Sequence, residues 1–312
     1  MWLWPPRGGR LSNANHGGRM TTIGIAGAGG ELGRRVAELV LATTDPAQVV
    51  LVSQLPGELE YLGERGAQVR ACDFDAPATL EDAFAGVDRL LLVSTDAVGR
   101  RTAEHVAAVL AAKAVGVSHL AYTSLPNAGA VDHPLGVIAV EHAETERAII
   151  DSGLDWTFLR NGVYVDPLLD VWADAVAKGA LVNNAGDGRT AFVTRDDCAA
   201  AAAAVLTGEG HERQAYDITG PNLLTLFDVA ALLSDITGRV VETVRLDDDA
   251  YVARLVGAGV PESFARISAE FGIAIRRGLL EAHTGALERL TGRAATSVAD
   301  YLAANREALA PR

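Results

Sequence analysis

Residues 22–33 read TIGIAGAGGELG. The segment Ile23–Ala26 is short and apolar, and it ends at a glycine, which is typical of a buried strand. A run with helical spacing of its apolar side chains follows, from Glu31 to about Thr43. A strand, a glycine-rich turn and a helix in this order predict the opening βα unit of an α/β sheet.

The glycines of the turn have a spacing that suits a phosphate ligand. Gly27, Gly30 and Gly33 fit the pattern G-x-x-G-x-x-G, whereas G-x-G-x-x-G fails because Leu32 stands at its last position. Glycine permits a sharp turn and a close approach to a pyrophosphate, and the helix N-terminus offers free N–H groups. The alternative is a tight strand–helix turn without a ligand. We expect a dinucleotide to be bound by Gly27, Ala28, Gly29, Gly30, Glu31, Leu32 and Gly33.

Further along the chain, short apolar runs alternate with helical patterns. We expect strands at 49–52, 68–70, 89–93, 119–123 and 155–160, and helices at 79–85, 101–115 and 137–152. Strands that are apolar throughout and separated by helices are typical of a parallel sheet covered on both faces. The fold class predicted is α/β, with a doubly wound parallel Rossmann sheet.

Three regions follow from these patterns. Residues 21–160 form the predicted Rossmann domain. Residues 161–312 form a smaller, mostly helical lobe with returns to the sheet near Thr190 and Tyr216, and its helices are expected at 223–237, 248–257, 262–270 and 298–309. Residues 1–20 carry no periodic apolar pattern and are predicted to be a disordered extension, with Met20 as a candidate start. The alternative is a docking arm that uses Trp2 and Trp4.

Composition excludes several classes of function. The chain has 27 Lys and Arg against 40 Asp and Glu, a net charge of −13, which argues against nucleic-acid binding. Its two cysteines, Cys72 and Cys198, provide neither a disulfide framework nor a metal site and suit the cytoplasm. No apolar run is long enough to span a membrane. The expected partner is therefore a small molecule; the oligomeric state is open.

Polar residues follow the predicted fourth, fifth and sixth strands. Ligands of such sheets bind outside the carboxyl ends of the strands, so these clusters predict one shared crevice. Their alternative role is capping and turn formation. The clusters are Ser94-Thr95-Asp96, Thr123-Ser124 and Asn161-Gly162-Val163-Tyr164.

Candidates for proton transfer are few. A Tyr-x-x-x-Lys pair is absent, because Val109 and Asp174 stand four residues before the two lysines, Lys113 and Lys178. His142 lies among glutamates, so we expect it to titrate near neutrality and to donate a proton. The alternative for His142 is a solvated helix face.

Several segments together resemble one family, the NmrA-like atypical short-chain dehydrogenases/reductases, and in particular its type 2 NAD(P)H:quinone oxidoreductases, with triphenylmethane reductase nearby. The similarity runs from about Thr22 through nearly all of the remaining chain. The segments are, in order, GAGGELG (27–33), VSTDAVGRR (93–101), AYTSLPNAG (121–129), EHAETER (141–147), TFLRNGVY (157–164) and AGDGRTAFVTRDDCAAAAAAVL (185–206).

The resemblance implies NAD(P)H bound between two lobes. It places the pyrophosphate on Gly27–Gly33 and the ribose and nicotinamide beside Ser94, Thr95 and Asp96, with Phe192 nearby. Ser124 is a further candidate for cofactor binding because of its place at the end of the predicted fifth strand, not because of the resemblance. The nicotinamide would be approached by Asn161, Gly162, Val163, Tyr164, Val165 and Asp166.

One departure from the family concerns cofactor preference. The family often has an arginine after the second strand that binds the 2′-phosphate of NADPH, but this chain has Gln54 there, with Glu58 close behind. Arg34 and Arg35 are other candidates for the phosphate, although they also fit a solvent-facing helix surface. The family therefore implies NADPH, and Gln54 makes NADH an expected cofactor as well.

Two functions remain open at this point. The resemblance favours an NAD(P)H-dependent reductase that transfers hydride to a quinone or similar conjugated acceptor, which His142, Asn161 and Tyr164 would orient or protonate. In phenylcoumaran and isoflavone reductases a catalytic lysine stands at the position of His142, and the quinone reductases also lack it. The alternative is a non-catalytic NAD(P) sensor of the NmrA type.

Overall fold

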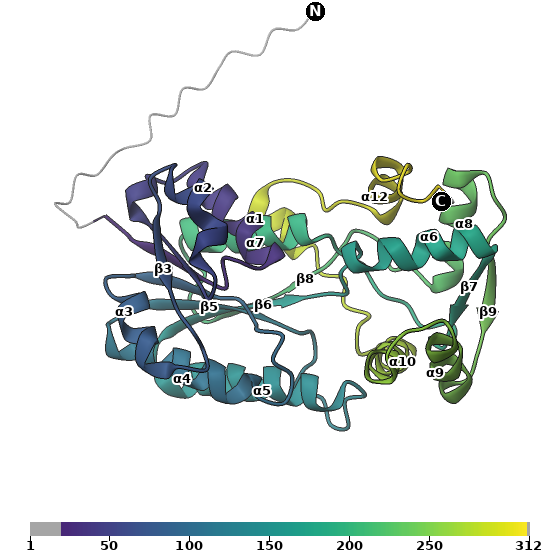
Figure 1. Cartoon of the computed structure of the whole chain (residues 1–312), viewed down its shortest axis with the longest axis horizontal. Coiled ribbons are helices and arrows are strands. Elements are labelled where there is room, and N and C mark those ends of the chain that lie inside the picture. The colour runs from purple at the N-terminus through teal and green to yellow at the C-terminus, as the bar shows by residue number, and fades with distance from the viewer. Residues whose placement is uncertain (1–19, 311–312) are drawn as a thin grey trace, which may run out of the picture.

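The computed structural model describes residues 20–310 (Figure 1). The predictions for the N-terminal extension, including the docking arm with Trp2 and Trp4, lie outside the described residues. Met20 is exposed.

The predicted α/β fold is confirmed. Seven parallel strands form one sheet in the order β3-β2-β1-β4-β5-β6-β8. From β1 the chain builds the sheet outward through β2 to β3, and it then crosses back to place β4 on the other side of β1. The topological switch point therefore lies between β1 and β4. The strands are β1 (Ile23–Ala26), β2 (Val49–Ser53), β3 (Gln68–Ala71), β4 (Arg89–Leu92), β5 (His119–Ser124), β6 (Asp155–Asn161) and β8 (Gln214–Ile218).

Helices cover both faces of this sheet and bury its apolar strands (Figure 1). The alanine-rich helix α7 presents small side chains, which let it pack closely against α1. One face carries α1 (Glu31–Leu41), α7 (Arg195–Thr207) and α11 (Ala286–Thr291). The other face carries α3 (Leu80–Phe84), α4 (Arg101–Ala114) and α5 (Gly136–Ser152). Four short helical segments complete the Rossmann part of the chain: η1 (Pro46–Gln48), η2 (Pro56–Leu59), α2 (Glu60–Gly63) and η3 (Pro77–Thr79).

The mostly helical second lobe is also present, with its own apolar core. It holds a small parallel sheet of β7 and β9 that the sequence did not indicate. Tyr216 lies in β8, as predicted, but the return of Thr190 is wrong, because Thr190 bridges only Leu224. Its elements are η4 (Asp166–Leu168), α6 (Leu169–Lys178), β7 (Ala180–Asn183), α8 (Leu226–Thr237), β9 (Glu242–Arg245), α9 (Asp248–Gly257), α10 (Glu262–Arg276) and α12 (Val298–Ala304).

The described residues also bear on membranes and metals. Within residues 20–310, no helix combines the length and apolarity that a membrane span requires. The same residues hold no group of metal-ligating side chains. Cys72 and Cys198 are both free and buried.

Candidate functional site

The glycine-rich turn between β1 and α1 is built by close backbone packing. Gly27 has a φ of +91°, a left-handed conformation that favours glycine. The N–H groups of Gly27 and Ala28 both donate to the Val52 carbonyl at 3.1 Å, which fixes the turn to β2. A Cβ atom on Gly33 would lie 2.1 Å from the Gly27 oxygen, so only glycine lets α1 start this close to the turn.

The N-terminus of α1 is open for an anion. Gly30 caps the helix without any side-chain hydrogen bond, and it is exposed. The first N–H groups of a helix have no partner inside the helix, and they carry a partial positive charge. These groups therefore suit the pyrophosphate that the glycine pattern predicted. Ala28 and Leu32 are buried, so their contribution to a ligand is confined to the backbone.

Two buried polar atoms without partners lie beyond the switch point. Ser124 ends β5 and Asn161 ends β6, and both residues are at most 5% exposed. The Ser124 hydroxyl and the Asn161 side-chain oxygen have no hydrogen-bond partner. Because buried polar atoms are almost always paired, these two atoms fit a bound polar group at the carboxyl edge of the sheet.

Tyr164 is held beside Asn161. The Asn161 side-chain N–H donates to the Tyr164 hydroxyl at 2.8 Å, and the Arg195 guanidinium lies 5.5 Å from the centre of the tyrosine ring. Burial raises the pKa of Tyr164 above its usual value, so the phenol stays protonated. The next residues are tied to the start of α7, where Asp166 accepts the Arg195 backbone N–H at 2.8 Å.

His142 does not behave as the sequence predicted. It is buried, and its Nδ1 lies 2.8 Å from the Tyr122 hydroxyl, while its Nε2 lies 3.4 Å from the Arg101 guanidinium. Burial, and then the positive charge of Arg101, lower the pKa of His142 to about 3. The prediction that it titrates near neutrality is therefore wrong, because the neighbouring glutamates do not face its ring.

The three polar residues after β4 differ in how far their side chains are exposed and bound. Thr95 turns inward, since its hydroxyl donates to Glu104 at 2.8 Å and its carbonyl accepts from Arg101 at 2.7 Å. Ser94 is half-buried, with its N–H bound to the Thr123 hydroxyl at 2.8 Å, and Asp96 is exposed. Asp96 is thus available to a ligand. The Thr95 side chain is not, and the Ser94 hydroxyl donates to the Thr95 carbonyl at 3.4 Å.

The side chain of Phe192 is buried. It is 2% exposed and packs edge-on against Trp172 in the core of the second lobe, with ring centres 5.8 Å apart. A side chain enclosed in this way offers little surface to a cofactor, so a contact of Phe192 with a cofactor would be confined to its backbone. Val165 is similarly buried, while Gly162 and Val163 are half-buried.

Comparison with known proteins supports this geometry. Residues 27–209 match the family model described as NAD(P)H-binding. The chain belongs to this NAD(P)H-binding family. It is 37% identical to quinone oxidoreductase 2 of Escherichia coli (strain K12), over 89% of this chain and 96% of that protein. It is 31% identical to an NAD(P)H azoreductase of Xenophilus azovorans, over 91% of this chain and 98% of that protein.

Two solved structures with bound cofactor are also similar to this chain in fold and sequence. The NADPH complex of the NADPH-dependent quinone oxidoreductase from Escherichia coli superposes with a TM-score of 0.88 at 36% identity, covering 91% of this chain and all of that one (100%). The NADP(H) complex of the Citrobacter sp. triphenylmethane reductase gives 0.83 at 32% identity, covering 89% of this chain and 98% of that one. The predicted class of cofactor, NAD(P)H, is thereby confirmed.

At the position where the family often binds the 2′-phosphate, this chain has the neutral Gln54, with Arg34 and Glu58 close by. Gln54 is exposed at the end of β2 and reaches Asp73 at 3.4 Å. Arg34 donates to the Gly29 carbonyl at 3.1 Å and lies 3.6 Å from the Glu58 carboxylate. Arg34 therefore lies against the glycine-rich turn while its side chain remains partly exposed, and its place in the sequence did not indicate this contact.

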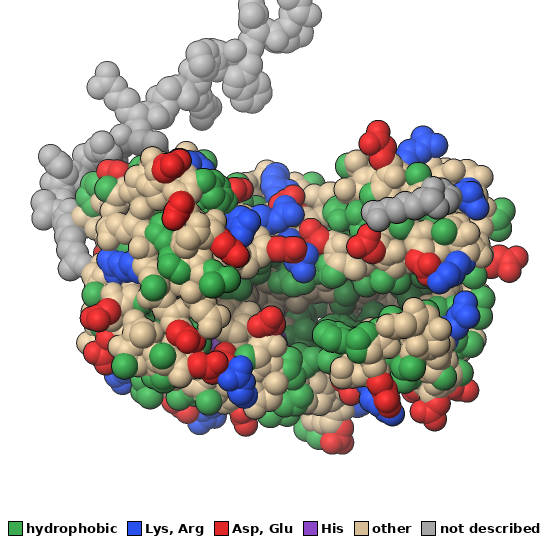
Figure 2. Space-filling model, in the orientation of Figure 1, with side chains coloured by type: hydrophobic (Ala, Val, Ile, Leu, Met, Phe, Trp, Pro, Cys, Tyr) green, Lys and Arg blue, Asp and Glu red, His purple; other side chains and the backbone are tan. Residues whose placement is uncertain are grey.

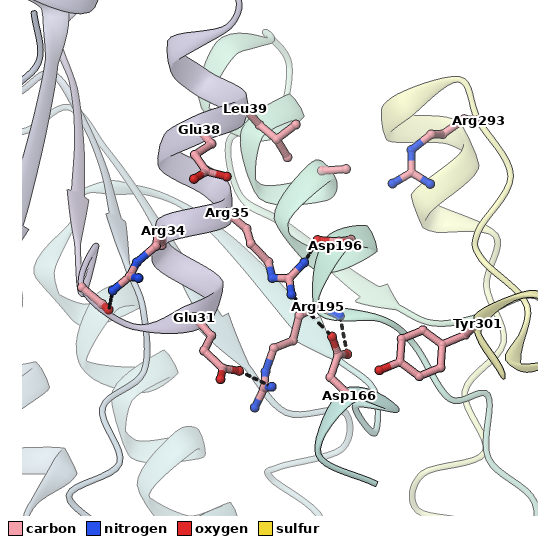
Figure 3. Close-up of a pocket in the computed structure, with 12 residues that line it drawn as sticks. Glu31, Arg34, Arg35, Glu38, Leu39, Asp166, Arg195, Asp196, Arg293 and Tyr301 are labelled. Carbon is pink, nitrogen blue, oxygen red and sulfur yellow. Dashed lines mark hydrogen bonds and ion pairs between the residues drawn. The ribbon is translucent and has the colours of Figure 1, made fainter. Parts of the chain in front are cut away.

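A groove lined mostly by charged side chains lies between the two lobes, beside this turn (Figure 3). Its volume is about 800 Å³. Arg195 pairs with Glu31 across the groove, and Arg35 pairs with Asp196 and lies 4.0 Å from Asp166. Arg195 and Tyr301, the aromatic residue of α12, also line the groove. The sequence alone does not indicate this, because the two residues come from distant segments.

Proposed function

We propose that this chain is an NAD(P)H-dependent reductase that transfers hydride to a quinone or similar conjugated acceptor. The observation that carries the proposal is the N-terminus of α1, which has no side-chain cap, together with the unpartnered Ser124 hydroxyl and Asn161 side-chain oxygen at the same edge of the sheet. Relatives that match nine-tenths of the chain are a quinone oxidoreductase and an azoreductase, which supports this class of acceptor.

The residues would divide the task between binding and orientation. The turn from Gly27 to Gly33 holds the pyrophosphate, and Ser94, Asp96 and Ser124 line the path towards the nicotinamide. Asn161, fixed against Tyr164, orients the nicotinamide or the acceptor with its free oxygen. The bound cofactor supplies the hydride.

The acceptor side suits a flat apolar molecule. The molecule is hollowed between its two lobes, and hydrophobic side chains form much of the wall of this hollow (Figure 2). Such a wall excludes water and leaves orientation to a few polar groups. Transfer of a hydride to a quinone leaves a hydroquinone monoanion, whose negative charge is shared between one phenolate oxygen and the ring. Water can protonate this phenolate, so the enzyme needs no strong acid of its own.

We also propose that the protein works in the cytoplasm on a small molecule alone, without nucleic acid. Its free, buried cysteines suit a reducing compartment. The net charge of −13 opposes binding to a phosphate backbone.

The direct test measures consumption of NADPH and NADH with a panel of small quinones, azo dyes and triphenylmethane dyes. We expect turnover with at least one quinone. An NAD(P) sensor would instead bind the cofactor in a titration but would not oxidise it with any acceptor of the panel. Binding without turnover across the panel would therefore favour the sensor.

Replacement of Asn161 by alanine is expected to lower kcat/KM for the quinone by about tenfold to a hundredfold, because a misplaced reactant loses orientation. Lys113→Ala and Lys178→Ala are the matched controls. Lys113 binds the Ser152 carbonyl and Lys178 pairs with Asp174, both on exposed helix surfaces. Steady-state kinetics on folded variants checks this prediction. An equal loss of kcat/KM in either lysine variant would indicate that a lysine takes part in proton transfer.

A further inference from the structure

Thr95 is hydrogen-bonded by a cluster of buried polar side chains on α4. Its N–H donates to His105 Nε2 at 3.2 Å, its carbonyl accepts from Arg101 Nε at 2.7 Å, and its hydroxyl donates to Glu104 at 2.8 Å. Every hydrogen-bonding group of Thr95 therefore engages α4. The segment that follows β4 at the switch point is fixed by these contacts rather than left as a free loop.

The direction of the hydrogen bonds identifies the tautomer of His105. A backbone N–H can only donate, so Nε2 of His105 carries no proton and Nδ1 carries it. Nδ1 lies 3.0 Å from the Thr145 hydroxyl, and that hydroxyl donates to the Glu141 carbonyl at 2.7 Å. A one-directional chain thus runs from Thr95 through His105 to the backbone of α5.

His105 remains neutral in this chain. It is fully buried, and its ring meets Tyr122 edge-on with 5.3 Å between centres. Burial, then the positive charge of Arg101, and last the electrostatic interaction with the nearby His142 ring lower the pKa of His105 to about 3. A protonated ring would lose the acceptor that Thr95 requires, so this environment preserves the contact at neutral pH.

The cluster also fixes the two helices to each other. Glu141, on α5, accepts the backbone N–H groups of Gly99 at 2.9 Å and Arg101 at 3.1 Å, which lie at the start of α4. Thr95 is consequently held by a rigid frame. Ser94, the residue before Thr95, is positioned by this frame and by the Thr123 hydroxyl, which accepts its N–H.

We infer that His105 is a positioning residue for the cofactor, and that its Nε2 holds the backbone of Thr95 so that the segment from Ser94 to Asp96 keeps its place at the carboxyl edge of the sheet, where the cofactor is proposed to bind. This inference rests on the proposed function for its catalytic consequence. Its structural consequence, the ordered backbone at Thr95, is independent of any reaction.

Two amide variants separate the two bonds of His105. In His105→Gln the side-chain oxygen can reach the place of Nε2 and accept from Thr95. In His105→Asn the shorter side chain reaches only the place of Nδ1, so it can bind Thr145 but leaves Thr95 unpaired. We expect His105→Gln to keep NADPH affinity within about threefold of wild type and His105→Asn to lose about tenfold.

Nuclear magnetic resonance of the cofactor-free protein tests the frame directly. We expect the ¹⁵N shifts to show a protonated Nδ1 and a bare Nε2, and the Thr95 amide to exchange slowly in wild type and His105→Gln. In His105→Asn we expect exchange at Thr95 to be at least tenfold faster, measured at matched global stability. A protonated Nε2, or equal Thr95 exchange in both variants, would overturn the inference.

The kinetic measurement distinguishes this inference from the proposed function. If wild type reduces no acceptor but the NADPH affinities and Thr95 exchange differ as expected, the reductase proposal fails and the positioning role stands. If wild type turns over and His105→Asn matches it in NADPH affinity and kcat/KM, the positioning role is wrong.

Discussion

A Gly30→Val variant is expected to lose NAD(P)H affinity by well over tenfold while keeping its fold. Gly30 has a φ of −73° and a ψ of 163°, an extended conformation that valine adopts readily. A Cβ atom there meets only the Gly27 oxygen, at an ordinary 3.5 Å. The added branches would instead occupy the space in front of the α1 N-terminus, where the pyrophosphate must approach the backbone.

The matched control for this variant is Gly33→Ala, three residues along the same turn. Its Cβ atom would lie 2.1 Å from the Gly27 oxygen, so the turn or helix must shift. Overpacking of this kind costs about 1–3 kcal/mol, and we expect a lower Tm. Calorimetric titration with NADPH, together with circular dichroism and thermal melts, checks the pair. Unchanged affinity in a folded Gly30→Val variant would show that the pyrophosphate lies elsewhere.

The fold followed from patterns that are local in the sequence. The apolar run Ile23–Ala26 forms β1 with the predicted bounds, because a glycine turn ends it sharply. The start of α8 was placed too early, at residue 223, although the sequence contains the signal that corrects it. Thr225 and Asp228 form a capping box, which starts the helix at Leu226.

The site depended on contacts that the sequence does not show. His142 has carboxylates as neighbours along the chain, but Glu146 binds Arg160 and Glu141 binds the start of α4. The groups that face the His142 ring are Tyr122 from β5 and Arg101 from α4. The environment of a buried ring is set by tertiary packing, so local charge patterns mispredicted its pKa.

The final prediction concerns the choice between NADPH and NADH. We expect weak discrimination in wild type, and a shift of about tenfold to a hundredfold towards NADPH in Gln54→Arg. Gln54 is exposed where the family often has an arginine, and it can offer only neutral hydrogen bonds. A hydrogen bond to a charged group contributes about 1.5–3 kcal/mol, and each decade of affinity corresponds to about 1.4 kcal/mol. The shift should shrink at high salt, because the contact is exposed.

Arg34 is the competing ligand for the 2′-phosphate, and a second pair of variants isolates its role. Its guanidinium already lies over the turn, with Glu58 at 3.6 Å to oppose a phosphate at the same place. Arg34→Gln should therefore weaken NADPH more than NADH, whereas Glu58→Gln should strengthen NADPH by removing the opposing charge. Titrations of each variant with both cofactors measure these preferences. A wild-type protein that prefers NADPH a hundredfold, and loses this preference in Arg34→Gln, would show that Arg34 binds the phosphate and that Gln54 does not limit it.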